Sequence, residues 1–212
     1  MINNCFDLHV HSHYSYDCKS NPKEILKIAK KKKLAGLAIT DHNVTKFHQK
    51  GYNSKELLII PGIEISTNKG HVIGLGISNT IERKLSVKET IEKIINLGGY
   101  PIIPHPFDFT RKGIGRELQN LKGIGIETIN GSCPLGWFNK KAKRWAEKNN
   151  LPETGGSDSH RLKDIGLAYT VFEDNIESTE ELIEAIRKGQ SKSQGSHLSI
   201  YAKIVRAFQI HF

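Results

Sequence analysis

The sequence predicts an α/β domain in which strands and helices alternate around a parallel sheet, either closed into a barrel or open and doubly wound. Short apolar runs typical of strands alternate with segments whose apolar residues recur at helical spacing. Most of the side chains that can bind metals follow directly after an apolar run, at the strand end where barrel enzymes build their active sites. We expect a single domain over 1–212, because 212 residues suffice for a substantial core.

The predicted strands are short runs rich in Ile, Val and Leu. Gly, Pro and Asn stand beside several of them and mark the points where the chain leaves the sheet. In chain order, we expect strands at 6–10, 37–40, 57–60, 72–77, 102–104, 124–129 and 167–172.

Two of the predicted helices carry start signals. Asn21 followed by Pro22 is typical of an N-cap and a first helical residue, and Glu24 should close a capping box with Asn21. Ser86 and Glu89 have the spacing of a capping box, and the helix that they begin should end at Gly98.

The remaining helices are predicted from the spacing of apolar side chains. We expect them over 138–149 and 178–188. The stretch 191–212 should form a tail of the domain. It begins with a polar run, 191–196, that we interpret as a loop, and it continues as a helix over 198–208.

The composition limits the class of protein. A formal net charge of +9 favours phosphate-bearing partners, although a solvated surface explains that charge equally well. No apolar run is long enough to span a bilayer and no signal peptide is apparent, so we expect no membrane partner. Cys5, Cys18 and Cys133 lack CxxC spacing and favour a reducing, cytoplasmic location. Nothing indicates an obligate protein partner.

The chemistry of the sequence is concentrated in segments that contain histidine. His9 and His11 share one face of a predicted strand, so both imidazoles can point at one ion. A lone histidine is usually a hydrogen-bonded structural residue, but several such segments together indicate one polynuclear metal site. The other segments are Thr40-Asp41-His42-Asn43, Pro104-His105-Pro106 and Gly156-Ser157-Asp158-Ser159-His160.

Two further residues extend this site. Glu64 lies in an otherwise apolar run, where a carboxylate is costly to bury without a cation, and it is the candidate bridge between ions. His71 opens the next run, near enough for a hairpin to bring it beside Glu64. Asp158 and His160 repeat the i, i+2 spacing of the first two histidines within a glycine-rich approach that lets the backbone come close to ions.

As a set and in their order, these motifs resemble those of the polymerase and histidinol phosphatase (PHP) family of metal-dependent phosphoesterases. The resemblance covers nearly the whole chain. It implies a distorted (β/α)7 barrel with a trinuclear site at the C-terminal ends of the strands, holding three divalent ions of Mn, Zn or Fe. The motifs are Asp7-Leu8-His9-Val10-His11-Ser12, Ala38-Ile39-Thr40-Asp41-His42-Asn43, Pro61-Gly62-Ile63-Glu64, Pro104-His105-Pro106-Phe107 and Gly156-Ser157-Asp158-Ser159-His160.

The resemblance also implies a ligand set, in which Glu64 bridges two of the ions. Glu64, Asp158 and His71 are then expected to be essential for catalysis. The first ion would be held by His9, His11, Glu64 and Asp158, the second by Glu64, His71 and His105, and the third by Asp17, His42 and His160.

Other residues near these motifs allow more than one interpretation. Arg111 is the cation that we expect to bind substrate phosphate; Lys112 and Arg161 could do the same or be exposed loop cations. His13 could contact the site or be an ordinary polar residue, and we leave it outside the ligand set. Cys133 could bind a metal as thiolate or be a buried thiol without a role.

The implied reaction is metal-assisted hydrolysis of a phosphoester, most simply by a phosphomonoesterase or nucleotide phosphatase. By resemblance, Asp17 and His71 match the branch that acts on nucleotides. The segment 77–101 holds little more than one helix, so the helical insertion that caps the pocket in that branch should be absent. The alternatives are an exonuclease on short RNA or DNA, a histidinol phosphatase and a non-catalytic PHP-like binding module.

Overall fold

Each apolar run that the sequence marks as a strand forms one in the computed structural model, which describes residues 4–198. The strands form a single mixed sheet in the order β7-β6-β5-β4-β3-β2-β1-β8-β9. They are β1 (Cys5–Val10), β2 (Gly36–Ile39), β3 (Leu58–Ser66), β4 (His71–Leu75), β5 (Tyr100–Ile103), β6 (Gly125–Asn130), β7 (Glu153–Gly156), β8 (Ala168–Phe172) and β9 (Ser191–Gly195).

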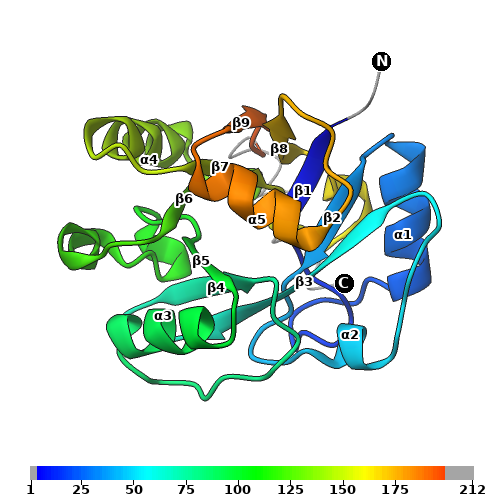
Figure 1. Ribbon diagram of the computed structural model, residues 1–212, viewed down its shortest axis with the longest axis horizontal. Coiled ribbons are helices and arrows are strands. Elements are labelled where there is room, and N and C mark those ends of the chain that lie inside the picture. The colour runs from blue at the N-terminus through cyan, green and yellow to red at the C-terminus, as the bar shows by residue number, and fades with distance from the viewer. Residues whose placement is uncertain (1–3, 199–212) are drawn as a thin grey trace, which may run out of the picture.

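The helices lie outside this sheet (Figure 1), with α1 on one side, α3 and α4 on the other, and α5 across the front. The α-helices are α1 (Pro22–Lys31), α2 (Lys46–Gln49), α3 (Val87–Asn96), α4 (Gly136–Lys148) and α5 (Thr179–Arg187). Short 3₁₀ helices are η1 (Phe109–Arg111), η2 (Gly115–Asn120) and η3 (Leu162–Asp164).

The predicted caps at Asn21 and Ser86 are confirmed, whereas the capping box expected at Glu24 does not form. The Asn21 side chain accepts a hydrogen bond from the Lys23 N–H at 2.9 Å and caps α1. Ser86 and Glu89 form both bonds of the capping box at α3. Within residues 4–198 no helix is long and apolar enough to cross a membrane.

The sheet is mixed rather than parallel: β4 runs antiparallel to β3, as the hairpin expected at His71 requires, and to β5, while β8 runs antiparallel to β1 and β9. Only residues 67–70 connect β3 to β4, and Thr67 N donates to Gly70 O at 2.7 Å to close the turn. Such a short connection permits only an antiparallel pair. As a result, the first residue of β4, His71, pairs with Ser66 and lies at the edge where the parallel strands end.

The sheet curls until β7 meets β1, which confirms the predicted barrel as a nearly closed one. His9 O accepts from Asp158 N at 2.7 Å, and Ser159 O accepts from His11 N at 3.0 Å. The sequence did not predict β7, because its residues are small. Glycine is required here: a Cβ on Gly156 would lie 2.4 Å from the Cβ of His9.

The polar run 191–196 was predicted to be a loop, and this prediction is wrong. It contains the edge strand β9, which pairs with β8. Its serines replace apolar contacts with hydrogen bonds: Ser193 Oγ lies 2.7 Å from Thr128 Oγ1, and Ser191 Oγ donates to Glu153 O at 2.7 Å. Apart from Leu198, the predicted helix over 198–208 lies outside the described residues. The single domain over 1–212 stays a prediction.

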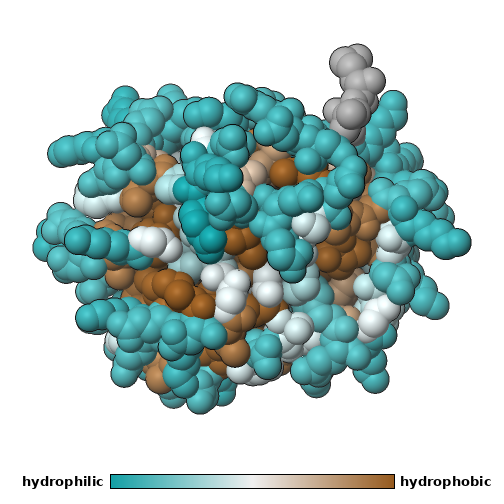
Figure 2. Space-filling view, viewed as in Figure 1, coloured by the Kyte–Doolittle hydropathy of each residue, from teal (hydrophilic) through white to brown (hydrophobic). Residues whose placement is uncertain are grey.

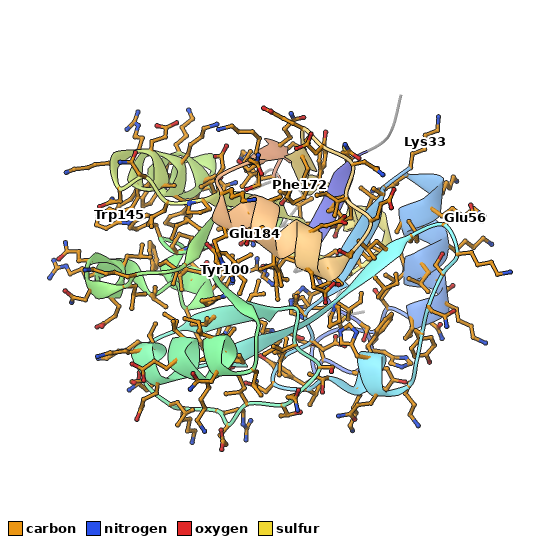
Figure 3. All side chains as sticks on the ribbon, viewed as in Figure 1. Lys33, Glu56, Tyr100, Trp145, Phe172 and Glu184 are labelled. Atoms are coloured by element: carbon orange, nitrogen blue, oxygen red, sulfur yellow. The ribbon has the colours of Figure 1, made fainter. Side chains whose placement is uncertain are left out.

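One end of the barrel is closed by apolar packing. Leu182, Ile183 and Ile186 of α5 lie in one buried cluster with Phe6 and Phe172. Figure 3 shows Tyr100 and Phe172 beside α5, and Figure 2 shows hydrophobic residues on both sides of this helix within a hydrophilic border. The polar side chains of the barrel interior are therefore gathered toward the other end.

Candidate metal centre

All of the predicted ligands lie together at the end of the barrel opposite α5. The carboxyl ends of the parallel strands and the first residue of β4 meet there, which brings distant parts of the chain into contact. His9 lies in β1, Glu64 in β3 and His71 at the start of β4, whereas Asp17, His11, His42, His105, Asp158 and His160 lie in the loops that follow strands.

Glu64 is the centre of the cluster. Its side chain is 1% exposed, and both carboxylate oxygens face histidine nitrogens. Burial alone would raise the pKa of Glu64, but His71, His42 and His9 around it hold that pKa well below its usual range. Oε2 lies 3.0 Å from His42 Nδ1, 3.3 Å from His11 Nε2 and 3.4 Å from His9 Nε2, and Oε1 lies 3.0 Å from His71 Nδ1 and 3.2 Å from His105 Nε2.

Asp158 adds a second buried carboxylate. Its Oδ1 lies 3.3 Å from His11 Nε2 and 3.6 Å from His9 Nε2, while its Oδ2 pairs with the Arg111 guanidinium. Burial opposes ionisation, but Arg111 and His9 hold the pKa of Asp158 well below its usual range. The same pairing places Arg111 against the cluster, where its Nη1 also donates to Asn130 Oδ1 at 3.3 Å.

The third predicted group lies nearer to solvent. Asp17 Oδ2 is 3.3 Å from His42 Nε2 and 3.2 Å from His160 Nε2. Although partial burial would raise the pKa of Asp17, hydrogen bonds from His160 and His42 lower it below the usual range. For His160, burial disfavours the charged imidazolium and would lower the pKa, but Asp17 and Asp158 raise it above the usual value.

The donor atoms fit divalent ions. His9 Nε2 and His11 Nε2 face each other at 3.1 Å, with Glu64 and Asp158 beside them. Within residues 4–198, the buried Nδ1 atoms of His42, His71 and His105 form no hydrogen bond. Of these atoms, Nδ1 of His42 and Nδ1 of His71 face Glu64, and buried imidazole nitrogens beside a carboxylate are suited to bind a metal; His105 faces Glu64 through Nε2. Ligand atoms within 4.8 Å of one another define the groups His9-His11-Glu64, His42-Glu64-His71 and His11-His42-His160.

A further layer of residues orients these histidines. Glu127 accepts from His105 N at 2.8 Å and from Asn130 Nδ2 at 2.8 Å, and its Oε1 lies 2.9 Å from His9 Nδ1. Holding Nδ1 fixes the ring so that Nε2 faces the centre. Sequence reasoning did not assign Glu127 this role. The signal was present, because it is a carboxylate in the apolar run of β6, just as Glu64 is in β3.

Ser15 and Asp7 also hold the site in place. Ser15 Oγ lies 3.1 Å from His11 Nδ1 and accepts from His42 N at 2.8 Å. Asp7 accepts from Ser157 N at 2.8 Å and from Gly166 N at 2.7 Å, and burial raises its pKa to about 6. These bonds tie β1 to the segment that carries Asp158.

Two of the candidate ligands adopt left-handed backbone conformations. His105 has a φ of 33° and Asp158 a φ of 50°. This region disfavours residues with a Cβ, by about 1 kcal/mol or more. The surrounding structure enforces both conformations, and such strain is concentrated at functional sites.

The cluster opens into a cavity of about 230 Å³. Arg111 and Lys112 both line this cavity, whereas Arg161, which precedes η3, does not. The lining is completed by Tyr16, Asp17, His42, Glu64, His71, His105, Thr110, Asp158 and His160.

His13 and Cys133 are outside the cluster. The His13 ring is exposed and packs edge-on against Tyr14 with ring centroids 4.4 Å apart. The buried Cys133 thiol lies 3.8 Å from Asp108 Oδ2 and 3.6 Å from Leu135 O. It belongs to none of the candidate ligand groups, so the structure favours the interpretation of a buried thiol.

Comparison with known proteins places the chain in a family. Residues 136–191 match the model of the PHP-associated family. The chain is 36% identical to the uncharacterized protein MJ0417 of Methanocaldococcus jannaschii over 185 residues, which are 83% of this chain and 74% of that protein. A two-domain protein of Bacteroides vulgatus that contains a predicted PHP-like metal-dependent phosphoesterase superposes with a TM-score of 0.73 at 20% identity. The chain belongs to the PHP-like metal-dependent phosphoesterase family.

This PHP-like chain corresponds to part of larger proteins of known structure. The superposition covers 91% of the chain but 64% of the B. vulgatus protein. The lesion-specific endonuclease EndoQ of Pyrococcus furiosus superposes with a TM-score of 0.63 at 17% identity, over 89% of this chain and 57% of the endonuclease. At these identities the likeness establishes the shared fold.

Proposed function

We propose that this PHP-like chain hydrolyses phosphomonoesters, with nucleotides as the favoured class, at a centre of three divalent ions. The observation that carries the proposal is the buried Glu64 carboxylate, ringed by histidine nitrogens, at the floor of a cavity whose wall presents Arg111 and Lys112. Ligands for several cations and a cationic wall together suit a phosphate group.

For the three ions we propose the ligand groups that the resemblance implies; the geometric groups share members with them but also bring His42 beside Glu64 and His71. Glu64 would bridge two ions, because its two oxygens face different sets of histidines. When bound, divalent ions supply an acidified water and neutralise charge on phosphate oxygens. The groups are His9, His11, Glu64 and Asp158 for one ion, Glu64, His71 and His105 for the next, and Asp17, His42 and His160 for the third.

Arg111 orients the phosphate. Its guanidinium is held by Asp158 and Asn130, and the side chain remains 24% exposed at the cavity wall. The remaining N–H donors can form the paired hydrogen bonds that a phosphate accepts. Lys112, the next residue, adds a second positive charge on the same wall. The substrate phosphate thus meets cationic side chains on one side and the ligand cluster on the other.

The test combines metal content with a substrate panel. Purified protein is analysed for Mn, Zn and Fe and assayed with p-nitrophenyl phosphate, nucleoside monophosphates and bisphosphates, histidinol phosphate and short RNA and DNA. We expect about three ions per chain and turnover of the nucleotides. Less than one tightly bound ion together with no turnover would overturn the proposal and favour a binding module.

A nuclease is the second candidate, favoured by the net charge of +9 and by the likeness in fold to a lesion-specific endonuclease. Salt separates the two candidates. A strand that contacts several cations loses affinity steeply as salt rises, whereas a mononucleotide responds weakly. Turnover of oligonucleotides with a steep fall between 50 and 200 mM salt would favour the nuclease.

A further inference from the structure

Exposed aromatic side chains gather on the segments beside the cavity. Tyr16 is 82% exposed, Phe109 74% and Trp137 48%, the aromatic rings among the large apolar side chains exposed in residues 4–198. Tyr16 lines the cavity itself and stacks on His42 with ring centroids 5.2 Å apart. Water-exposed rings grouped beside an active site indicate that a ligand covers them.

Phe109 and Trp137 both contact the buried ring of Phe138, which connects them. The Phe138 ring, 2% exposed, meets Phe109 edge-on at 5.4 Å and lies 4.0 Å from Trp137. We call Phe109, Trp137 and Phe138 the aromatic ledge. It begins at the cavity wall, because Arg111 and Lys112 follow Phe109 directly in and after η1, and it ends at the first turn of α4.

The helix that carries the ledge is strongly basic. Its sequence, GWFNKKAKRWAEK, holds five basic residues against one acidic residue. Lys140 and Lys141 are exposed and follow Trp137 by three and four residues. They therefore lie on the same face of α4 as Trp137, one turn further from the start of the helix. Lys141 Nζ lies 4.5 Å from the ring centroid of Phe107, two residues after the predicted ligand His105 in the chain. Positive charge therefore continues from the cavity wall onto α4.

We propose that the aromatic ledge and the first turns of α4 bind a single-stranded oligonucleotide. A base stacks on Trp137 or Phe109, the backbone phosphates beyond it follow Lys140 and Lys141, and a neighbouring phosphate reaches Arg111 in the cavity. This inference rests on the second candidate under the proposed function, the nuclease, because the phosphate in the cavity would then be the phosphodiester that the centre hydrolyses. Alternating rings and cations are the features by which proteins bind single strands without reading their sequence.

The position of the ledge favours a strand over a mononucleotide. Phe109 and Trp137 do not line the cavity, whereas Tyr16 does. A mononucleotide with its phosphate on Arg111 would present its base to Tyr16 and leave the ledge bare. A second nucleotide is needed to span from the cavity to Trp137. An acidic peptide would satisfy the lysines of α4 but would leave the rings without a planar partner.

Tryptophan fluorescence reports on the ledge directly. The chain has two tryptophans, and Trp145→Phe leaves Trp137 as the single emitter; Figure 3 shows Trp145 farther along α4. Phosphorothioate oligothymidylates of two to twelve nucleotides, which resist hydrolysis, are titrated into the metal-loaded protein. We expect the oligomers to quench Trp137 fluorescence, with an affinity that increases with oligomer length. Trp137→Ala and Phe109→Ala, followed by anisotropy of a labelled oligomer, should each weaken binding about tenfold.

The lysines and a matched control complete the test. Lys140→Glu with Lys141→Glu should weaken binding and lower the slope of log affinity against log salt by about one for each lost phosphate contact. Leu97→Ala removes a side chain of similar exposure, 44%, beyond the end of α3 and should leave binding unchanged. Binding that ignores Trp137 and Phe109, or thymidine monophosphate that quenches Trp137 as tightly as the oligomer does, would overturn the inference.

Hydrolysis of p-nitrophenyl phosphate by the unaltered protein separates this inference from the proposed function. If the protein hydrolyses no phosphoester but still binds oligothymidylate through Trp137, the ledge stands and the proposed function fails. If it hydrolyses p-nitrophenyl phosphate but binds the oligomer independently of the ledge, the proposed function stands and the inference about the ledge fails.

Discussion

The two ends of the barrel are built from the same strands but have opposite contents. At the α5 end, Phe6, Phe172 and Ile186 pack with apolar neighbours and need no polar partner. At the other end, buried carboxylates and histidines face one another and the backbone is strained at His105 and Asp158. The comparison teaches that stability and chemistry are separated along the strands. Changes at one end should therefore affect folding, and changes at the other should affect metal binding and turnover.

The largest effect should come from Glu64. Glu64→Gln keeps the shape of the side chain but removes the charge that faces five histidines, so an ion should no longer be bridged. We expect kcat/KM for the best substrate to fall by about 10³-fold or more, which is about 4 kcal/mol. Metal analysis and steady-state kinetics measure it, with circular dichroism as the control for folding. Full metal-dependent turnover in this variant would remove Glu64 from the centre.

Phe6→Ala tests the opposite end. The ring is fully buried and lies edge-on to Phe172 with centroids 5.5 Å apart. Its loss should lower the free energy of unfolding by about 3–5 kcal/mol, measured by urea denaturation. The fraction of Phe6→Ala protein that remains folded should contain as much metal per chain as the unaltered protein. A loss of bound metal without a loss of stability would break the separation between the two ends.

Glu127→Gln sharpens the comparison within the metal end. The carboxylate contacts His9 and the backbone of His105 from behind, and the amide keeps only part of these bonds. Changes of such supporting groups cost about 10–100-fold in metal affinity or activity. Competition with a chelator followed by kinetics measures both. Unchanged metal affinity together with unchanged kcat would show that Glu127 merely fills space.

The smallest effect should come from the cap of α3, which contributes no side chain to the candidate ligand groups or to the apolar cluster of α5. Ser86→Ala removes the side chain that accepts from Glu89 N at 3.2 Å. It should lower the free energy of unfolding by about 1 kcal/mol and leave metal content and turnover unchanged. Thermal denaturation and the standard assay check both. Ser178→Ala, which removes the corresponding cap of α5, provides the matched comparison at the apolar end.

The sequence was informative wherever a residue type has few alternative explanations. Histidines beside Gly, Pro and Asp at the ends of apolar runs predicted the ligand cluster, and Glu64 stood out because a carboxylate is rare in such a run. Whether these residues hold the ions as assigned stays a prediction. For the fold, apolar periodicity and capping residues predicted most strands and helices.

The misses share a physical cause. β7 and β9 consist of glycine, serine and other small or polar residues, so they carry no apolar signal and are identified only through partners distant in the chain. The hairpin to β4 was expected from the short spacing between Glu64 and His71, whereas the antiparallel pairing of β8 with β1 has no signal in the side-chain pattern. Arg111 lines the cavity, in keeping with its expected place near a substrate, and its pairing with Asp158 is visible only in three dimensions.

The seam between β1 and β7 determines when the centre can be completed during synthesis. His9 and Asp158 are joined across it by a backbone hydrogen bond, although they come from opposite halves of the chain. At typical elongation rates, the ribosome needs about 3–10 s to pass from residue 105 to residue 158. During that interval the nascent chain carries most of the candidate ligands without the strand that closes them. The complete donor set of the proposed centre therefore exists only late in synthesis, and a chain that stops before β7 would offer ions only an incomplete set of donors.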